Sequence, residues 1–156
     1  MTKLAFTILA VQDLQRAREF YQKYFEQKLT VDMGKLIGFE SGLALWEEGD
    51  MAEQSGLEKT LLSGRGGMEI EFHTEGIEIL YQRLLAAGVE MLHPIKSHPW
   101  GQMVFRCKDL DGHCIEVDEY LWATARRLAE AGHVASDIAH CFGVTLEAVE
   151  EMLDTD

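Results

Sequence analysis

Short stretches of alternating apolar and polar residues recur along the chain, and this two-residue period is typical of β-strands with one buried face. In the first half the pattern predicts four strands, at residues 4–10, 29–31, 36–39 and 43–46. After the first of these, apolar residues recur at helical spacing from Leu14 to Phe25, and Asp13 stands at the expected N-cap. The first half therefore predicts a buried strand, then a helix, then three more strands.

The second half repeats this order about 60 to 70 residues further along, which is the scale of a structural repeat. It predicts strands at residues 68–74, 89–92, 102–107 and 113–118. A helix face runs from Ile77 to Leu84, Gly88 is its expected stop, and the polar stretch 47–67 predicts a linker. Two units that cannot bury their apolar faces alone predict an α+β fold of two βαβββ modules, at residues 4–47 and 68–119.

The last two predicted strands are joined by Asp109, Asp111 and Gly112, which are typical turn residues. Glu116 follows, in a strand whose other face is apolar. The stretch Asp-Leu-Asp-Gly-His-Cys-Ile-Glu that ends at Glu116 resembles the closing hairpin of the vicinal-oxygen-chelate superfamily, which contains glyoxalases, bleomycin-resistance proteins and ring-cleaving dioxygenases. The resemblance covers residues 4–119 and implies a curved mixed sheet of two βαβββ modules around a pocket.

Residues 121–156 lie outside this resemblance and predict a C-terminal helical appendage to a glyoxalase-like domain at residues 1–120. Residues 135–149 have the spacing of a helix-turn-helix, with Gly143 at the turn. From Trp122 onward, however, seven acidic residues accompany two arginines, a balance that would repel DNA. A packing or dimer-stabilising role is expected for these helices, and an interaction module is the alternative.

The chain carries a formal net charge of −13, which argues against a nucleic-acid partner because such partners are bound through Lys and Arg. No apolar run approaches the roughly 20 residues of a membrane span. The N-terminus lacks a signal-peptide pattern, so a cytoplasmic protein without a membrane partner is expected. Cys107, Cys114 and Cys141 have no ligand or disulfide spacing. A homodimer is expected, since superfamily members commonly pair and sheet edges need covering.

The predicted strand 68–74 carries three ionisable residues, Glu69, Glu71 and His73, on one face. Burying two carboxylates against a core would cost several kcal/mol each, so this face is expected to meet water, a cationic partner or a ligand. A pocket wall is the functional interpretation, and an ordinary exposed polar face is the alternative.

The resemblance also implies where a metal would bind, because metal-dependent relatives take ligands from four strands. Those positions fall on Phe6, near Ala44, on Glu69 and on Glu116. Phe6 and Ala44 cannot bind a metal, and two carboxylates alone would hold a divalent ion weakly. No metal and no other cofactor is therefore expected. His73, on the same face as Glu69, leaves open a rearranged site for a divalent ion.

Aromatic residues are expected near a ligand in both halves. Trp100 precedes the closing hairpin and would lie at a pocket rim, where it could stack on a planar ligand or close the end of the sheet as a plug. Phe6 and Trp46 fit the same roles in the first half.

Two functions follow from these residues and from the resemblance. A small-molecule-binding protein of the bleomycin-resistance type would use an acidic pocket without a catalytic metal, and such a pocket favours a cationic ligand. The alternative is a metal-dependent lyase or isomerase of the glyoxalase-I type, or a dioxygenase-like enzyme, in which Glu116 would move a proton. In either case Arg106 could pair with Glu116 or Glu71, or bind a substrate carboxylate. The residues leave catalysis open, and a glyoxalase-type lyase is the activity expected if there is one.

Overall fold

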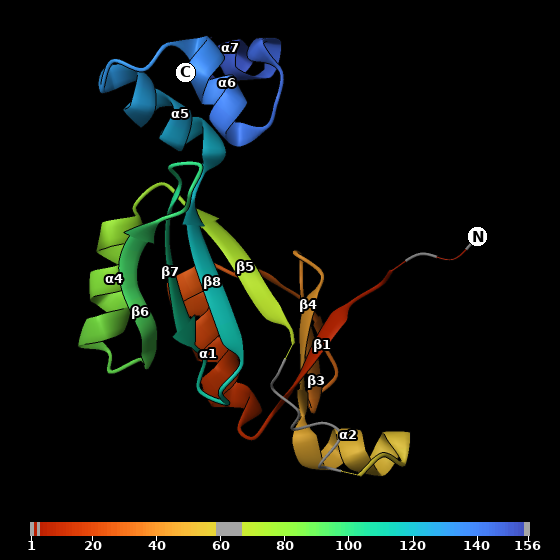
Figure 1. Ribbon diagram of the computed structural model, residues 1–156. Coiled ribbons are helices and arrows are strands. Elements are labelled where there is room, and N and C mark those ends of the chain that lie inside the picture. Colours follow the sequence, from red (N-terminus) through yellow and green to blue (C-terminus); the bar gives the residue numbers. More distant parts are fainter. Residues whose placement is uncertain (1, 3, 59–66, 155–156) are drawn as a thin grey trace. The chain divides into compact units, whose positions relative to one another are not determined.

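The computed structural model describes residues 2, 4–58 and 67–154, and the chain divides into two compact units (Figure 1). The first unit lies within residues 1–68 and includes the turn at 109–113. The second lies within residues 69–108 and 114–156. Each unit contains one four-stranded sheet with parallel and antiparallel pairs, so each is described by itself.

The described residues of the first unit form four strands and two helices: β1 (Thr7–Val11), α1 (Leu14–Phe25), β2 (Leu29–Asp32), β3 (Leu36–Phe39), β4 (Leu43–Glu47) and α2 (Glu48–Ser55). The strand order is β1-β4-β3-β2. β1 is parallel to β4, and the other two pairs are antiparallel.

α1 begins and packs as its sequence predicts. Its N-cap is Asp13, whose side chain accepts a hydrogen bond from the Arg16 backbone N–H at 3.0 Å. Its buried residues recur at three- to four-residue spacing: Ala17, Phe20, Tyr21 and Phe25. The Tyr21 hydroxyl donates to Oδ2 of Asp109 at 2.8 Å, which fixes the 109–113 turn within this unit.

The second unit has the same order of elements, followed by three more helices: β5 (Glu69–Thr74), α4 (Ile77–Ala86), β6 (Met91–Ser97), β7 (Met103–Lys108), β8 (Cys114–Glu119), α5 (Leu121–Glu130), α6 (Ala135–Phe142) and α7 (Leu146–Asp154). The strand order is β5-β8-β7-β6, with β5 parallel to β8 and the other pairs antiparallel. Because this repeats the order of the first unit, the predicted α+β fold of two βαβββ modules with C-terminal helices is confirmed.

Two separate apolar clusters stabilise the second unit. α4 contributes the buried residues Ile77, Leu80 and Leu84, and its Tyr81 ring meets the Phe105 ring of β7 edge-on at 5.2 Å. The C-terminal helices gather beyond one end of the strands (Figure 1) and have a small core of their own, formed by Ala125, Ile138, Ala139 and Val149. Among the described residues, no helix combines the length and the apolar composition needed to cross a membrane.

Local structure differs from the sequence prediction in the first unit. The predicted buried strand 4–10 begins only at Thr7, where pairing with β4 starts, and Leu4 is 81% exposed. The expected linker contains α2, whose first turn carries Glu48 and Asp50, a placement that a helix N-terminus favours. The linker residues 59–66 lie outside the described part of the chain.

In the second unit, the strand predicted at 89–92 runs instead from Met91 to Ser97. The pairing of β6 with β7 shifts register on both sides of His93, which marks an irregularity of the β-bulge type there. The last two strands each begin one residue later than predicted.

The Tyr21 contact predicts a measurable stability effect. Tyr21→Phe should lower the free energy of unfolding by about 1–2 kcal/mol, because it removes a hydrogen bond to a buried carboxylate. Tyr81→Phe is the control, since it deletes a phenol hydroxyl and keeps the ring contact with Phe105. Urea denaturation monitored by circular dichroism measures both, and equal losses in the two variants would contradict a specific role for the Asp109 contact.

Candidate functional site

Ionisable side chains gather on one face of the second sheet, which is here called the polar face. β5 and β8 are paired so that Glu71 lies opposite Glu116 and His73 lies opposite Asp118. Arg106 of β7 lies opposite Glu116 on its other side. The polar face therefore consists of Glu69, Glu71, His73, Arg106, Cys114, Glu116 and Asp118, with Lys108 at its edge opposite Cys114.

The Arg106 guanidinium lies between two carboxylates of the polar face. Its Nε donates to Oε2 of Glu69 at 2.8 Å, and its Nη2 donates to Oε2 of Glu116. The hydrogen bond from Arg106 lowers the pKa of Glu69 to about 2. Arg106 thus pairs with Glu116, as one of the predicted alternatives had it, and also with Glu69.

Glu116 is nearly buried, with 6% of its surface exposed. Burial, followed by Glu69 and Asp118, raises the pKa of Glu116 to about 7, although Arg106 acts in the opposite direction. A carboxyl group with this pKa is half-protonated near neutral pH and can accept or return a proton there. Such a pKa is compatible with the proton-transfer role that the sequence predicts for Glu116.

The predicted site residues Glu71 and His73 contact each other on the exposed part of the polar face. His73 Nε2 lies 2.7 Å from Oε1 of Glu71, and the His73 ring meets the Tyr120 ring at 5.5 Å. The ligand-type atoms of Glu71, His73 and Asp118 all lie within 4.8 Å of one another. Asp118 therefore lies close to both Glu71 and His73.

The residues missing from the sequence prediction are His98 and Asp118. His98 Nε2 lies 3.2 Å from Oε1 of Glu116 and 3.4 Å from Oδ1 of Asp118. Asp118 is 3% exposed, and burial, followed by the charge of Glu71, raises its pKa. Asp118 follows Glu116 by two residues, so strand alternation places both side chains on one face. His98 lies with Trp100 in the turn before β7, which the sequence places at the pocket rim, but no local pattern indicated that His98 contacts Glu116.

Trp100 lies in the same turn and contacts His98. The two rings are stacked, with centroids 4.1 Å apart and planes 11° apart. The indole Nε1 donates to Oε1 of Gln102 at 2.8 Å, which fixes the orientation of the ring. The Trp100 side chain therefore supports His98 and is 37% exposed.

Cys114 completes the polar face but is not an activated nucleophile. Its Sγ lies 3.8 Å from Oε2 of Glu69. Burial, followed by the negative charge of Glu69, raises the pKa of the Cys114 thiol, which keeps it protonated at neutral pH.

The other two predicted ligand contacts, Phe6 and Trp46, belong to the first unit. A Cβ at Gly38 would lie 3.1 Å from Cε1 of Phe6, so the ring rests on a strand that leaves space for it. Trp46 Nε1 donates to Oδ2 of Asp50 at 2.6 Å. Both aromatic rings thus have defined positions inside their own unit.

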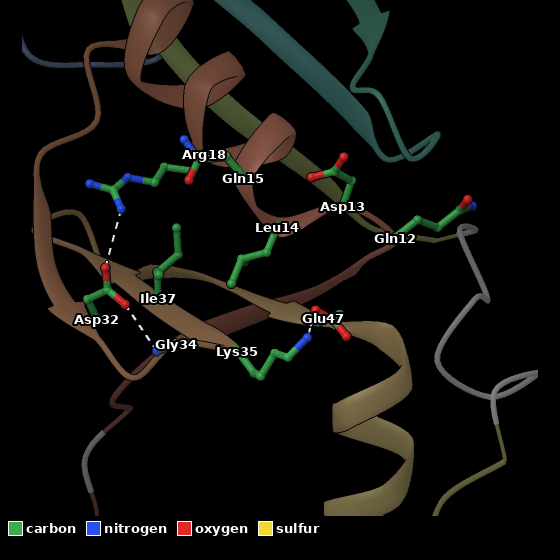
Figure 2. A pocket seen from close by; sticks show the side chains of 10 residues that line it. All are labelled: Gln12, Asp13, Leu14, Gln15, Arg18, Asp32, Gly34, Lys35, Ile37 and Glu47. Atoms are coloured by element: carbon green, nitrogen blue, oxygen red, sulfur yellow. Dashed lines mark hydrogen bonds and ion pairs between the residues drawn. The ribbon is translucent and has the colours of Figure 1, made fainter.

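The first unit also contains a cavity of about 440 Å³ beside the start of α1 (Figure 2). Leu14 and Ile37 point into the space between the helix and the strands. Charged residues surround it in pairs, with Arg18 3.3 Å from Asp32 and Lys35 2.5 Å from Glu47. None of its lining residues was predicted as a site residue. In each of the two pairs, the positive charge is balanced by the negative charge of its partner.

The donor set that the resemblance implies for a metal does not suit a divalent ion. Phe6 and Ala44 have no donor atoms, and Ala44 is fully buried. Glu69 and Glu116 already share the Arg106 guanidinium, which supplies the positive charge that an ion would otherwise bring. The four positions that the resemblance implies therefore lack the usual set of metal ligands.

Comparison with known proteins gives consistent matches. A family model described as a glyoxalase-like domain matches residues 4–122. A crystal structure of a protein of unknown function from Agrobacterium tumefaciens str. C58 is 31% identical, with a TM-score of 0.65, covering 76% of this chain and 94% of that one. A glyoxalase-related enzyme from Fulvimarina pelagi is 26% identical, with a TM-score of 0.65, covering 76% and 88%.

A lactoylglutathione lyase from Agrobacterium tumefaciens shares the fold, with 20% identity, a TM-score of 0.58 and coverage of 77% of this chain and 95% of that one. No curated protein sequence matches the chain.

The raised pKa of Glu116 predicts a pH-dependent stability. The folded value of about 7 lies above the ordinary value of 4.5, so the folded chain holds a proton that the unfolded chain releases, and the contribution of Glu116 is lost as pH rises through this window. The side chain in Glu116→Gln cannot ionise. From about pH 4.5 to pH 8, the free energy of unfolding of this variant should therefore rise by roughly 3 kcal/mol relative to that of the unmodified protein. Denaturant titrations at both pH values measure this, and a constant difference would contradict it.

The position of Arg106 predicts a change in metal affinity. Arg106→Met should raise the affinity for Mn²⁺ by roughly tenfold, because Glu69 and Glu116 lose their shared cation and Asp118 lies nearby. Lys108→Met is the control, since it removes a positive charge from the same strand at a residue paired with Glu90. Isothermal titration calorimetry measures both, and equal gains would show a general charge effect.

Proposed function

The chain belongs to the glyoxalase-like family of the vicinal-oxygen-chelate superfamily, and we propose that it binds a small, amine-bearing cation at the polar face of its second sheet. In this proposal Glu116 is the proton acceptor and no metal binds at the Glu69 and Glu116 positions.

The observation that carries this proposal is the excess of carboxylates on the polar face. Four carboxylates, on Glu69, Glu71, Glu116 and Asp118, share this face with the guanidinium of Arg106, which contacts only Glu69 and Glu116 among them. Lys108, further along the same strand, is paired with Glu90 at 2.7 Å. A positively charged ligand would offset the repulsion among these carboxylates, which adds to burial in raising the pKa of Glu116 and of Asp118.

Aromatic rings favour an organic cation over a simple ion. Trp100 stacks on His98, and Tyr120 meets His73, so a ring stands beside each histidine of the site. Both rings are partly exposed, and an ammonium group is attracted to the face of an aromatic ring by a cation–π interaction. The net charge of −13 would also draw cations toward the protein.

A metal-dependent, glyoxalase-type lyase is the second candidate, and one observation favours it. The ligand-type atoms of His98, Glu116 and Asp118 all lie within 4.8 Å of one another. Oδ1 of Asp118 has no hydrogen-bond partner in the described part of the chain, although His98 lies 3.4 Å away. An ion bound there would use Oε1 of Glu116, the oxygen that faces His98, whereas Arg106 contacts Oε2.

Benzylamine and benzyl alcohol test the first candidate, because they share a ring and differ in charge. Benzylamine should bind with a chemical-shift response at the polar face, and benzyl alcohol should bind at least about tenfold more weakly. Glu71→Gln and Asp118→Asn should each weaken benzylamine binding, since they remove negative charge from the site. NMR titration measures all of these affinities, and equal binding of the two probes would contradict a cation site.

Elemental analysis of protein purified without chelator tests the second candidate. One divalent ion per chain, lost in both His98→Gln and Asp118→Asn, would establish the metal-dependent alternative and overturn the metal-free proposal. Retention of the ion in both variants would locate it away from this cluster.

A further inference from the structure

We propose that Arg127 makes the C-terminal helices part of the site, by holding the turn that places His98 against Glu116 and Asp118. This inference rests on the proposed function, because it takes the polar face to be the binding site. It assigns α5 a positioning role in that site, in place of a role in packing alone.

Arg127 joins α5 to the end of β8 and to the turn before β7. Its Nη2 donates to the backbone oxygen of Gly101 at 2.7 Å and to Oε2 of Glu119 at 2.8 Å, and its Nε donates to Oε1 of Glu119 at 3.2 Å. Burial would raise the pKa of Glu119, but hydrogen bonds from Arg127 and Thr124 outweigh it and lower the pKa. The pair is therefore ionised at neutral pH, and its fork geometry fixes the guanidinium.

The turn itself is closely fitted to α5. Gly101 has φ of +95°, a conformation that glycine adopts readily, and a Cβ there would lie 3.3 Å from Cδ1 of Leu128. Backbone hydrogen bonds close the turn, from Gly101 N–H to His98 O at 2.9 Å and from His98 N–H to Gln102 O at 2.8 Å. Gln102 in turn donates to the backbone oxygen of Glu119 at 2.6 Å.

The turn carries the stacked pair that reaches the site. Trp100 holds His98 by ring stacking at 4.1 Å, and His98 Nε2 contacts Glu116 at 3.2 Å. Direct contacts therefore run from Arg127 through Gly101 to His98 and on to Glu116. An apolar cavity of about 190 Å³, lined by residues that include Trp100 and Leu128, lies between the turn and the helices. This space would let the turn move if the Arg127 contacts were removed.

The family match ends at residue 122, so Arg127 and most of α5 lie beyond the part of the chain that the family model describes. The positioning contact is thus supplied by a segment added after the glyoxalase-like domain. A contact of this kind links the order of the appended helices to the geometry of the site.

Three variants of the full chain test the proposal. Arg127→Met removes every contact of the guanidinium, and Arg127→Lys keeps a positive charge near Glu119 but not the fork. Arg126→Met is the matched control. Arg126 precedes Arg127 in the same helix, but its guanidinium lies over the Trp122 ring, 5.0 Å from the ring centroid. The first readout is the ring-current shift that Trp100 imposes on the His98 ring protons in the ligand-free protein, assigned with Trp100→Leu and His98→Gln.

In Arg127→Met the His98 ring resonances should move toward their positions in Trp100→Leu, with a smaller shift in Arg127→Lys and none in Arg126→Met. Benzylamine binding, the second readout, should weaken by about tenfold in Arg127→Met and remain unchanged in Arg126→Met. Should Arg127→Met fail to fold, Arg127→Lys carries the test.

Unaltered His98 resonances in a folded Arg127 variant would overturn the positioning role. Equal shifts in the Arg126 and Arg127 variants would overturn it as well, because they would report a general loosening of α5. If benzylamine fails to bind the unmodified protein while the His98 shifts appear as expected, the proposed function fails and the positioning role stands. The two proposals are therefore separately testable.

Discussion

The ion pairing of Arg106 with Glu69 and Glu116 is the interaction on which the polar face depends. Desolvating a carboxylate costs several kcal/mol unless a cation and hydrogen bonds compensate, and Glu116 is almost fully buried. Arg106, on the neighbouring strand, offsets part of that cost. It keeps Glu69 ionised and leaves Glu116 with a pKa of about 7, so two chemically identical side chains acquire different charges at neutral pH.

The two units share an order of elements but differ in the chemistry of their sheets. Across the parallel pair of the first sheet, Ile8 lies opposite Ala44. Across the parallel pair of the second, Glu71 lies opposite Glu116 and His73 lies opposite Asp118. The same backbone pairing therefore presents apolar residues in one unit and ionisable residues in the other. A repeated fold sets where side chains project, and the residue types decide which repeat carries a site.

The C-terminal helices connect stability to the site. Their own small core, with Ala125, Ile138 and Val149 fully or almost fully buried, holds α5 in place. α5 then presents Arg127 to a turn whose carbonyl oxygen needs a donor. An appendage that folds on its own apolar contacts can in this way fix a loop of the domain to which it is attached, without contributing a residue that contacts a ligand.

The sequence by itself determined the repeated element order, the start of α1 at Asp13, and the shared face of Glu69, Glu71 and His73. These features depend on local periods and caps, which are readable from neighbouring residues. Only the tertiary structure decided that Arg106 pairs with Glu69 as well as Glu116, and that His98 reaches the polar face. Those contacts depend on strand register, on the depth of burial and on the path of a turn, which residues distant in sequence fix together.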